Sequence, residues 1–110
     1  MVQTKSELFD KDLIKKANLF KALAHPARLQ ILQFLAKTNN CITGDISDEL
    51  PLGRTTVNQH IKELKKMGLI QGHVEGAKTK YCLKTDSIND LKKITEDFLG
   101  IFDTQNYKCD

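Results

Sequence analysis

A turn-forming triplet, Pro51-Leu52-Gly53, separates two short helical patterns in the middle of this 110-residue chain. Proline presets one backbone dihedral and glycine relieves the steric limits on another, so the triplet is typical of a tight turn. Before it, Thr43 is suited to cap a short helix that ends at Leu50. After it, a helix is predicted over about residues 54–67, and its apolar stripe consists of Val57, Ile61 and Leu64. Two such helices joined by a tight turn predict a helix-turn-helix.

The hydrophobic period changes after Gly68, a residue type that often ends a helix in the left-handed conformation. Residues 69–74 and 80–83 have the pattern of two strands, and residues 75–79 are expected to form the hairpin tip between them. A hairpin that directly follows the second helix of a helix-turn-helix has the position of a wing.

Helical spacing of apolar residues also predicts helices over about residues 6–23, 26–37 and 87–103. The first two are separated at His25-Pro26, because proline disfavours helical geometry in the residue before it. The expected fold is therefore one domain over residues 1–110, mainly α-helical with a small β-hairpin, in the order of a winged helix-turn-helix.

The last predicted helix carries apolar residues on more than one narrow stripe. A helix that is apolar on two sides needs a second surface against which to bury them. In a chain this small, that surface is expected to be another copy of the same protein.

The formal net charge of +3 is distributed unevenly along the chain. Residues 54–84 carry seven basic and two acidic side chains, a net charge of +5, whereas residues 85–110 have a net charge of −3. A basic middle indicates a localised surface for a polyanion, although charge alone fits a solvated lysine-rich face equally well.

The polar side chains of the helix over residues 54–67 change in kind along its length. Its first turns carry arginine, threonine, asparagine and glutamine, which can hydrogen-bond base edges in the major groove. Lysines, which suit phosphate, dominate the later turns. This gradient matches how a helix-turn-helix presents its second helix to DNA. The predicted DNA-binding residues are Arg54, Thr55, Thr56, Asn58, Gln59 and Lys62, with Lys78 and Lys80 of the wing.

Four strings in this order and spacing resemble the ArsR/SmtB family of bacterial winged helix-turn-helix repressors. They are residues 19–32, 53–64, 66–70 and 76–81, and the resemblance extends over about residues 8–102. It implies a homodimer that binds an imperfect palindrome in double-stranded DNA and is released by an inducer at a separate site. It also implies that the first and last helices form the dimer interface, for which the expected residues are Leu13, Phe20, Leu91, Phe98 and Phe102.

Within the second helix of the motif, the resemblance assigns DNA contacts to Arg54, Thr55, Asn58 and Gln59. Asn58 stands where the family often has serine, and its amide can still donate and accept. His60 matches a recurrent family histidine. Because it directly precedes Ile61 of the apolar stripe, a packing or helix-anchoring role is expected rather than a base contact.

Neither common metal site of the family can be written onto this chain. Ile42 and Gly44 occupy the positions of the family's Cys-x-Cys pair, and residues 87–103 contain no histidine. No metal site and no cofactor are therefore predicted.

Three cysteines leave the inducer open. Cys41 stands near the start of the helix predicted from Thr43, where the helix dipole favours a thiolate, and Cys109 lies on the C-terminal tail. One hypothesis is a repressor that responds through Cys41 and Cys109 to redox change, to persulfide or to arsenite. The other is that Cys41 and Cys82 are small semi-buried apolar residues and that Cys109 is a free tail thiol.

Other classes of protein are disfavoured. The sequence has no glycine-rich phosphate loop, no Ser/His/Asp arrangement and no close carboxylate pair, so an enzyme is not expected. No apolar run approaches the roughly 18–20 residues that span a bilayer, and the start lacks the order of a secretory signal. Three widely spaced cysteines do not indicate a disulfide framework, so a cytoplasmic protein is expected. A winged-helix module for protein–protein contact is the remaining alternative.

Overall fold

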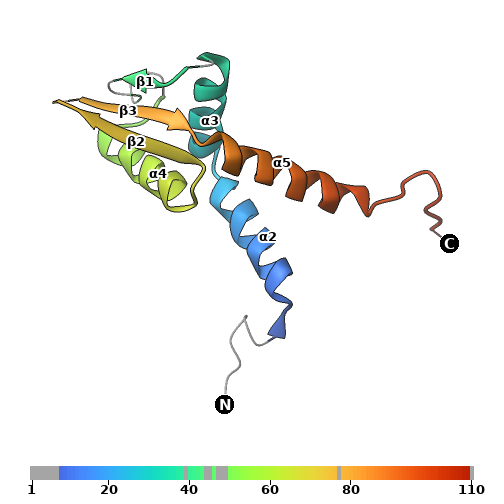
Figure 1. Cartoon of the computed structure of the whole chain (residues 1–110). Helices are drawn as coiled ribbons and strands as arrows, with labels where there is room; N and C mark the ends of the chain where they lie inside the picture. The colour runs from blue at the N-terminus through green and yellow to red at the C-terminus, as the bar shows by residue number, and fades with distance from the viewer. Residues whose placement is uncertain (1–7, 39, 44–45, 47–49, 77, 110) are drawn as a thin grey trace.

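The structure, a computed structural model, describes residues 8–38, 40–43, 46, 50–76 and 78–109. It is mainly helical with an antiparallel hairpin, which confirms the predicted fold class (Figure 1). In chain order the elements are α2 (Lys11–Leu23), α3 (Pro26–Thr38), β1 (Ile42–Thr43), α4 (Arg54–Lys66), β2 (Ile70–Glu75), β3 (Lys78–Leu83) and α5 (Thr85–Gly100). Figure 1 shows α2 and α5 both extending away from the body formed by α3, α4 and the sheet. No helix in the described ranges combines the length and the apolar character needed to cross a membrane.

The hydrophobic core lies where α3, α4 and the sheet meet. Ile31 of α3 and Val57 and Leu64 of α4 have no exposed surface, and Leu69 and Ile70 close the core from the sheet side. The apolar stripe predicted for α4 is therefore confirmed. Because it is fully buried against α3, the opposite face of α4 is turned outward.

The end of α4 follows the sequence prediction. Gly68 has a φ of +77°, which glycine adopts without the steric cost that a Cβ would impose. The N–H of Leu69 donates to the carbonyl of Leu64 at 3.0 Å, so a last-turn carbonyl of the helix is satisfied. The chain then enters β2 directly.

The sheet has three strands in the order β1-β3-β2, all antiparallel. Glu75 pairs with Lys78, so the tip is shorter than the predicted tip over residues 75–79. The strand β2 is shifted by one residue from the predicted 69–74, and β3 begins two residues before the predicted 80–83. Gly76, with a φ of +64°, occupies the left-handed region within this tight tip.

The strand β1 was not predicted. Thr43, expected to cap a helix, instead pairs with Lys80 of β3, and Ile42 pairs with Tyr81. Two β-branched residues suit an extended segment that pairs with the open edge of β3. The remainder of the helix predicted over residues 43–50 falls outside the described residues, apart from Ile46 and Leu50, which are buried.

The two outer helices have different ends from those predicted. The first was expected over about residues 6–23, but α2 begins at Lys11, because Asp10 caps it by accepting a hydrogen bond from the N–H of Asp12 at 3.3 Å. Residues 1–7 are outside the described part. The last helix was expected over about residues 87–103, whereas α5 covers Thr85–Gly100. The helix predicted over residues 26–37 is confirmed as α3.

Candidate nucleic-acid interface

The outward face of α4 carries the six helix residues that were predicted to bind DNA, and all six are exposed. They are Arg54, Thr55, Thr56, Asn58, Gln59 and Lys62. Gly53 precedes the helix and provides no side-chain cap. The N–H groups at a helix start suit a phosphate oxygen. The start of α4 can therefore offer side-chain amide and hydroxyl groups to base edges, and backbone N–H groups to the phosphates of a nucleic acid.

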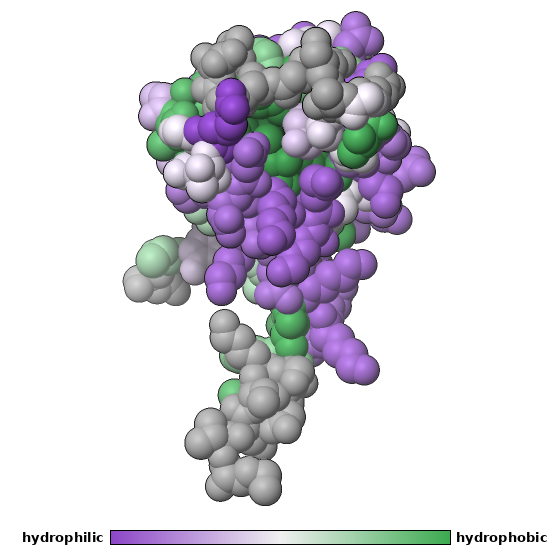
Figure 2. Space-filling view, turned by 90° about the vertical axis from the view of Figure 1, so that its left-hand side faces the viewer, coloured by the Kyte–Doolittle hydropathy of each residue, from purple (hydrophilic) through white to green (hydrophobic). Residues whose placement is uncertain are grey.

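The wing lies on the same side of the molecule as the start of α4 (Figure 1). Lys78 is the first residue of β3, at the hairpin tip, and its side chain is outside the described part. Lys80 is partly buried, opposite His73 in the register. Figure 2, which views the molecule from the wing side, shows hydrophilic side chains gathered over the middle of this face.

The position of α4 is fixed by a polar contact at its buried side. The side chain of His60 is only 8% exposed, and its Nδ1 accepts a hydrogen bond from Arg28 Nε at 3.2 Å. Arg28 Nη1 donates to the carbonyl of Ala22 at 2.8 Å, and the ring of His25 lies 4.1 Å from the ring of His60 between centroids. His60 is thus packed inside, as expected, and joins α4 to both α2 and α3.

The same contact requires neutral His60. Burial lowers the pKa of His60, and the neighbouring His25 and Arg28 lower it further. In the unfolded chain the imidazole titrates at about 6.5, so the unfolded state binds more protons below that pH. The stabilising contribution of His60 is therefore complete above this pH and is lost as pH falls through the lower pKa of the folded state.

We therefore expect the free energy of unfolding to be smaller at about pH 5.5 than at about pH 7.5. The variant His60→Gln keeps a side chain that can accept from Arg28 but cannot titrate, so its free energy of unfolding should change less between the two pH values. Urea unfolding of both proteins at each pH measures the difference. An equal change in both proteins would show that His60 is not the titrating group.

The predicted dimer residues lie on a largely apolar surface formed by α2 and α5. Leu13 is 51% exposed and Phe102 is 57% exposed, while Phe20, Leu91 and Phe98 are partly buried. The rings of Phe20 and Phe98 meet edge to face at 5.7 Å, and Phe102 contacts Phe98 at 5.5 Å from beyond the helix end.

Further apolar residues of this surface were missed by the sequence predictions. Phe9 lines a groove of about 560 Å³ beside α2, and Leu99 and Ile101 are exposed at the end of α5. The helix α5 contains no buried residue at all. Leu99 and Ile101 belong to the two-sided apolar pattern for which a second surface was expected, although neither was named among the dimer residues.

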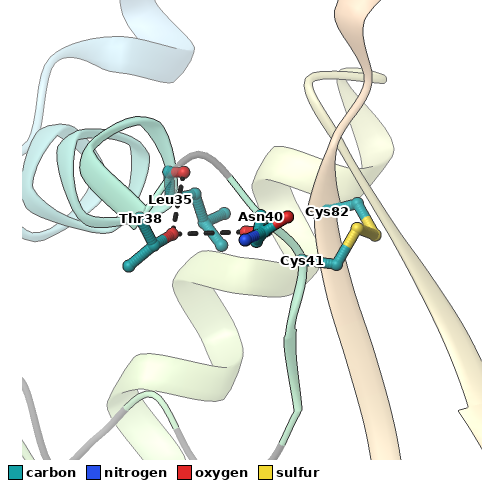
Figure 3. The surroundings of a disulfide bond; sticks show 5 residues. All are labelled: Leu35, Thr38, Asn40, Cys41 and Cys82. Atoms are coloured by element: carbon teal, nitrogen blue, oxygen red, sulfur yellow. Dashed lines mark hydrogen bonds between the residues drawn. A yellow bond between two sulfur atoms is a disulfide. The ribbon is translucent and has the colours of Figure 1, made fainter.

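The cysteines are arranged differently from the hypothesis that paired Cys41 with Cys109. Cys41 forms a disulfide with Cys82, with 4.3 Å between their Cα atoms, and Cys109 is a free, exposed thiol (Figure 3). This pairing was not predicted from the sequence, because β1 was not predicted. Once Ile42 pairs with Tyr81, the two cysteines face each other across neighbouring strands. Among the residues that the structure describes, no three histidine, cysteine or acidic residues gather to hold a metal ion.

Comparison with known proteins identifies the family. The sequence pattern of the protein family described as "Bacterial regulatory protein, arsR family" matches residues 25–71. An uncharacterised HTH-type transcriptional regulator of Methanocaldococcus jannaschii is 32% identical over 83 residues, which cover 76% of this chain and 93% of that protein. The transcriptional repressor SdpR of Bacillus subtilis is 34% identical over 76 residues, covering 66% of this chain and 83% of SdpR.

A solved structure shows the same fold. HlyU from Vibrio cholerae aligns with a TM-score of 0.64 and 27% identity, covering 82% of this chain and 97% of HlyU. A second structure, of reduced HlyU from the same organism, aligns with a TM-score of 0.63 and 28% identity. The alignment covers 80% of this chain and 92% of that chain. The protein is a winged helix-turn-helix regulator of transcription that binds DNA, and not an enzyme. It belongs to the ArsR family.

Proposed function

We propose that the protein is a repressor that binds a palindromic operator as a homodimer and leaves it when an inducer binds. The observation that carries the proposal is the division of α4 into a buried apolar stripe and an exposed face of six side chains suited to DNA. SdpR, a relative of similar length, is named a transcriptional repressor.

The roles on α4 follow from position along the helix. Arg54 and Gln59 stand in the first turns and offer two-pronged hydrogen bonding to base edges. Lys62 stands later on the helix and offers a single positive charge to a phosphate. Lys78 and Lys80 contact the backbone or the minor groove beside the helix.

The dimer follows from the surface that α2 and α5 leave uncovered. Leu13, Leu99 and Phe102 are all more than half exposed, and no residue of α5 is fully buried within its own chain. Two copies joined through this surface present two recognition helices related by a twofold axis, which is why the operator is palindromic.

Selection of duplexes from a randomised pool tests this function. We expect the selected sequences to contain an inverted repeat, with half-site centres about 10–10.5 base pairs apart or a multiple of that spacing. A motif without an inverted repeat would contradict the homodimer on DNA. A pool with no enriched motif would contradict sequence-specific binding.

A second function, a response to redox change, is favoured by the contact between Cys41 and Cys82. This disulfide joins the residue just before β1 to β3 of the wing and closes a loop with a sequence separation of 41 that contains α4. The chain entering β1 is held near its start, because the hydroxyl of Thr38 lies 3.1 Å from the carbonyl oxygen of Leu35 and 3.2 Å from that of Asn40 (Figure 3). Breaking the disulfide releases the tie between the wing and the segment that leads to α4.

Hydrogen peroxide takes two electrons and two protons from the thiols of Cys41 and Cys82, the sulfur–sulfur bond forms, and the peroxide leaves as two water molecules. Dithiothreitol reverses the step, because its two thiols give up two protons and two electrons and close into a cyclic disulfide.

We expect reduction to weaken operator binding by the wild type by about threefold or more, since a wing held in place costs less to order on DNA. Cys41→Ser and Cys82→Ser should bind equally with and without reductant, whereas Cys109→Ser should respond like the wild type. Fluorescence anisotropy of a labelled operator measures this. A response that is lost in Cys109→Ser but kept in Cys82→Ser would instead support the hypothesis that Cys41 pairs with Cys109. Adding arsenite to the same reduced proteins tests the metalloid hypothesis.

A further inference from the structure

A basic cleft lies between α2, the start of α3 and the end of α4, on the other side of α2 from the aromatic contact with α5. Its volume is about 830 Å³. The residues that matter for its chemistry are Lys11, Ile14, Lys15, Lys21, Arg28 and Met67. The volume falls in the range of about 300–1,000 Å³ that is usual for small-molecule sites.

The charge of the cleft is strongly one-sided. Four lysine and arginine side chains line it, with His25 beside them, and Glu63 is its single acidic residue. Lys11 and Lys15 are one helical turn apart on α2, where two like charges repel each other and destabilise the helix. In the described ranges the one ion pair is formed by Lys16 and Asp12, so these two lysines have no acidic partner there. A bound anion would remove the repulsion between them.

Part of the lining of the cleft is apolar. Ile14 and Ala22 come from α2, and Met67 comes from the end of α4. An inorganic ion would leave these groups facing water, whereas an organic molecule can cover them with an apolar body. The positive charge and the apolar part of the lining together favour a ligand with an apolar body and an anionic group.

Arg28 connects the cleft to the recognition helix. Its Nε donates to His60 of α4 and its Nη1 donates to the carbonyl of Ala22, which leaves Nη2 without a hydrogen-bond partner in the described part of the protein. A planar guanidinium pairs well with carboxylate and phosphate groups. An anion that binds Arg28 therefore competes for, or reorients, the group that holds His60.

We propose that this cleft binds an organic anion, with a carboxylate or phosphate group on an apolar body, and that Arg28 transmits its binding to α4 through His60. The site is then the inducer site of the repressor, an assignment that rests on the proposed function. The binding itself does not depend on DNA.

Calorimetric titration of the full chain with 2-naphthyl phosphate and 2-naphthoate tests the binding, with 2-naphthol and inorganic phosphate as matched probes. We expect at least one of the two anions to bind, and the double variant Lys15→Gln/Lys21→Gln to bind it about tenfold more weakly. Lys37→Gln, an exposed lysine in the last turn of α3 outside the cleft, should bind it like the wild type. Each of three results would overturn the site: no binding of either anion, equal binding by the double variant, or a matched probe binding as tightly as the anions.

Backbone amide signals in NMR spectra test the transmission without DNA. Adding the bound anion should shift the signals of His60 and Ile61 in the wild type, and to a smaller extent in Arg28→Lys. Unchanged signals at both positions, with binding intact, would overturn the transmission. If the probe binds and shifts α4 but no duplex is ever bound, the proposed repressor function fails while the cleft stands.

Discussion

Replacing Phe98 with aspartate is expected to convert the protein to monomers and to reduce operator binding by about 100-fold or more, because the two half-sites are then bound separately. Phe98 stands at the centre of the apolar surface, 5.7 Å from the ring of Phe20 and 5.5 Å from that of Phe102. A carboxylate there would be removed from water on dimerisation at a cost that exceeds the gain from the surrounding apolar contacts.

Sedimentation measures the oligomeric state of Phe98→Asp, and far-UV circular dichroism shows whether the monomer remains folded. Because Phe98 is only partly buried within its own chain, we expect the helical signal to be kept. Val74→Asp is the matched control for the oligomeric state, since Val74 is 79% exposed but lies on β2, away from α2 and α5. A Phe98→Asp protein that still sediments as a dimer would remove α5 from the interface.

Replacing Arg54 or Gln59 with alanine is expected to lower the preference for operator over random duplex by about 1–3 kcal/mol each. Both side chains are exposed on the first turns of α4, where the helix presents donors and acceptors to base edges. Lys62→Ala is the matched control on the same helix. Its loss should be equal on the two duplexes, because a phosphate contact carries no sequence information.

Competition between labelled operator and random duplex, at one fixed salt concentration, measures both losses. If Arg54→Ala weakens the two duplexes equally, Arg54 positions the helix on the backbone and does not read a base. If Lys62→Ala reduces the preference for operator over random duplex, the assignment of base contacts to the first turns of α4 and phosphate contacts to its later turns is wrong.

The parts of the fold that sequence could predict are those set by local periodicity. The stripe of Val57, Ile61 and Leu64 and the stop at Gly68 place α4 to within a residue or two, and with it the exposed face. The start of α2 was missed because Leu8 and Phe9 continue the apolar period, while the cap made by Asp10 overrides it.

Features of the structure that depend on contacts between residues far apart in the sequence could not be predicted. The strand β1 has only two residues and exists because β3 offers an edge to it, so the meeting of Cys41 with Cys82 could not be seen in the spacing of the cysteines. The basic cleft likewise combines three segments, and in the sequence its lysines had the pattern of an ordinary solvated helix face.

Measuring the affinity for a duplex as a function of salt concentration tests most directly whether the exposed face of α4 binds DNA. Each phosphate contact releases condensed counterions, so the logarithm of the binding constant should fall linearly with the logarithm of salt concentration, with a slope of about −0.9 for each contact. Lys62→Ala should make that slope shallower by about one unit. The expected result is tight binding at low salt that weakens steeply as salt rises. Absence of duplex binding at low salt would contradict a DNA-binding function and favour a module for protein–protein contact.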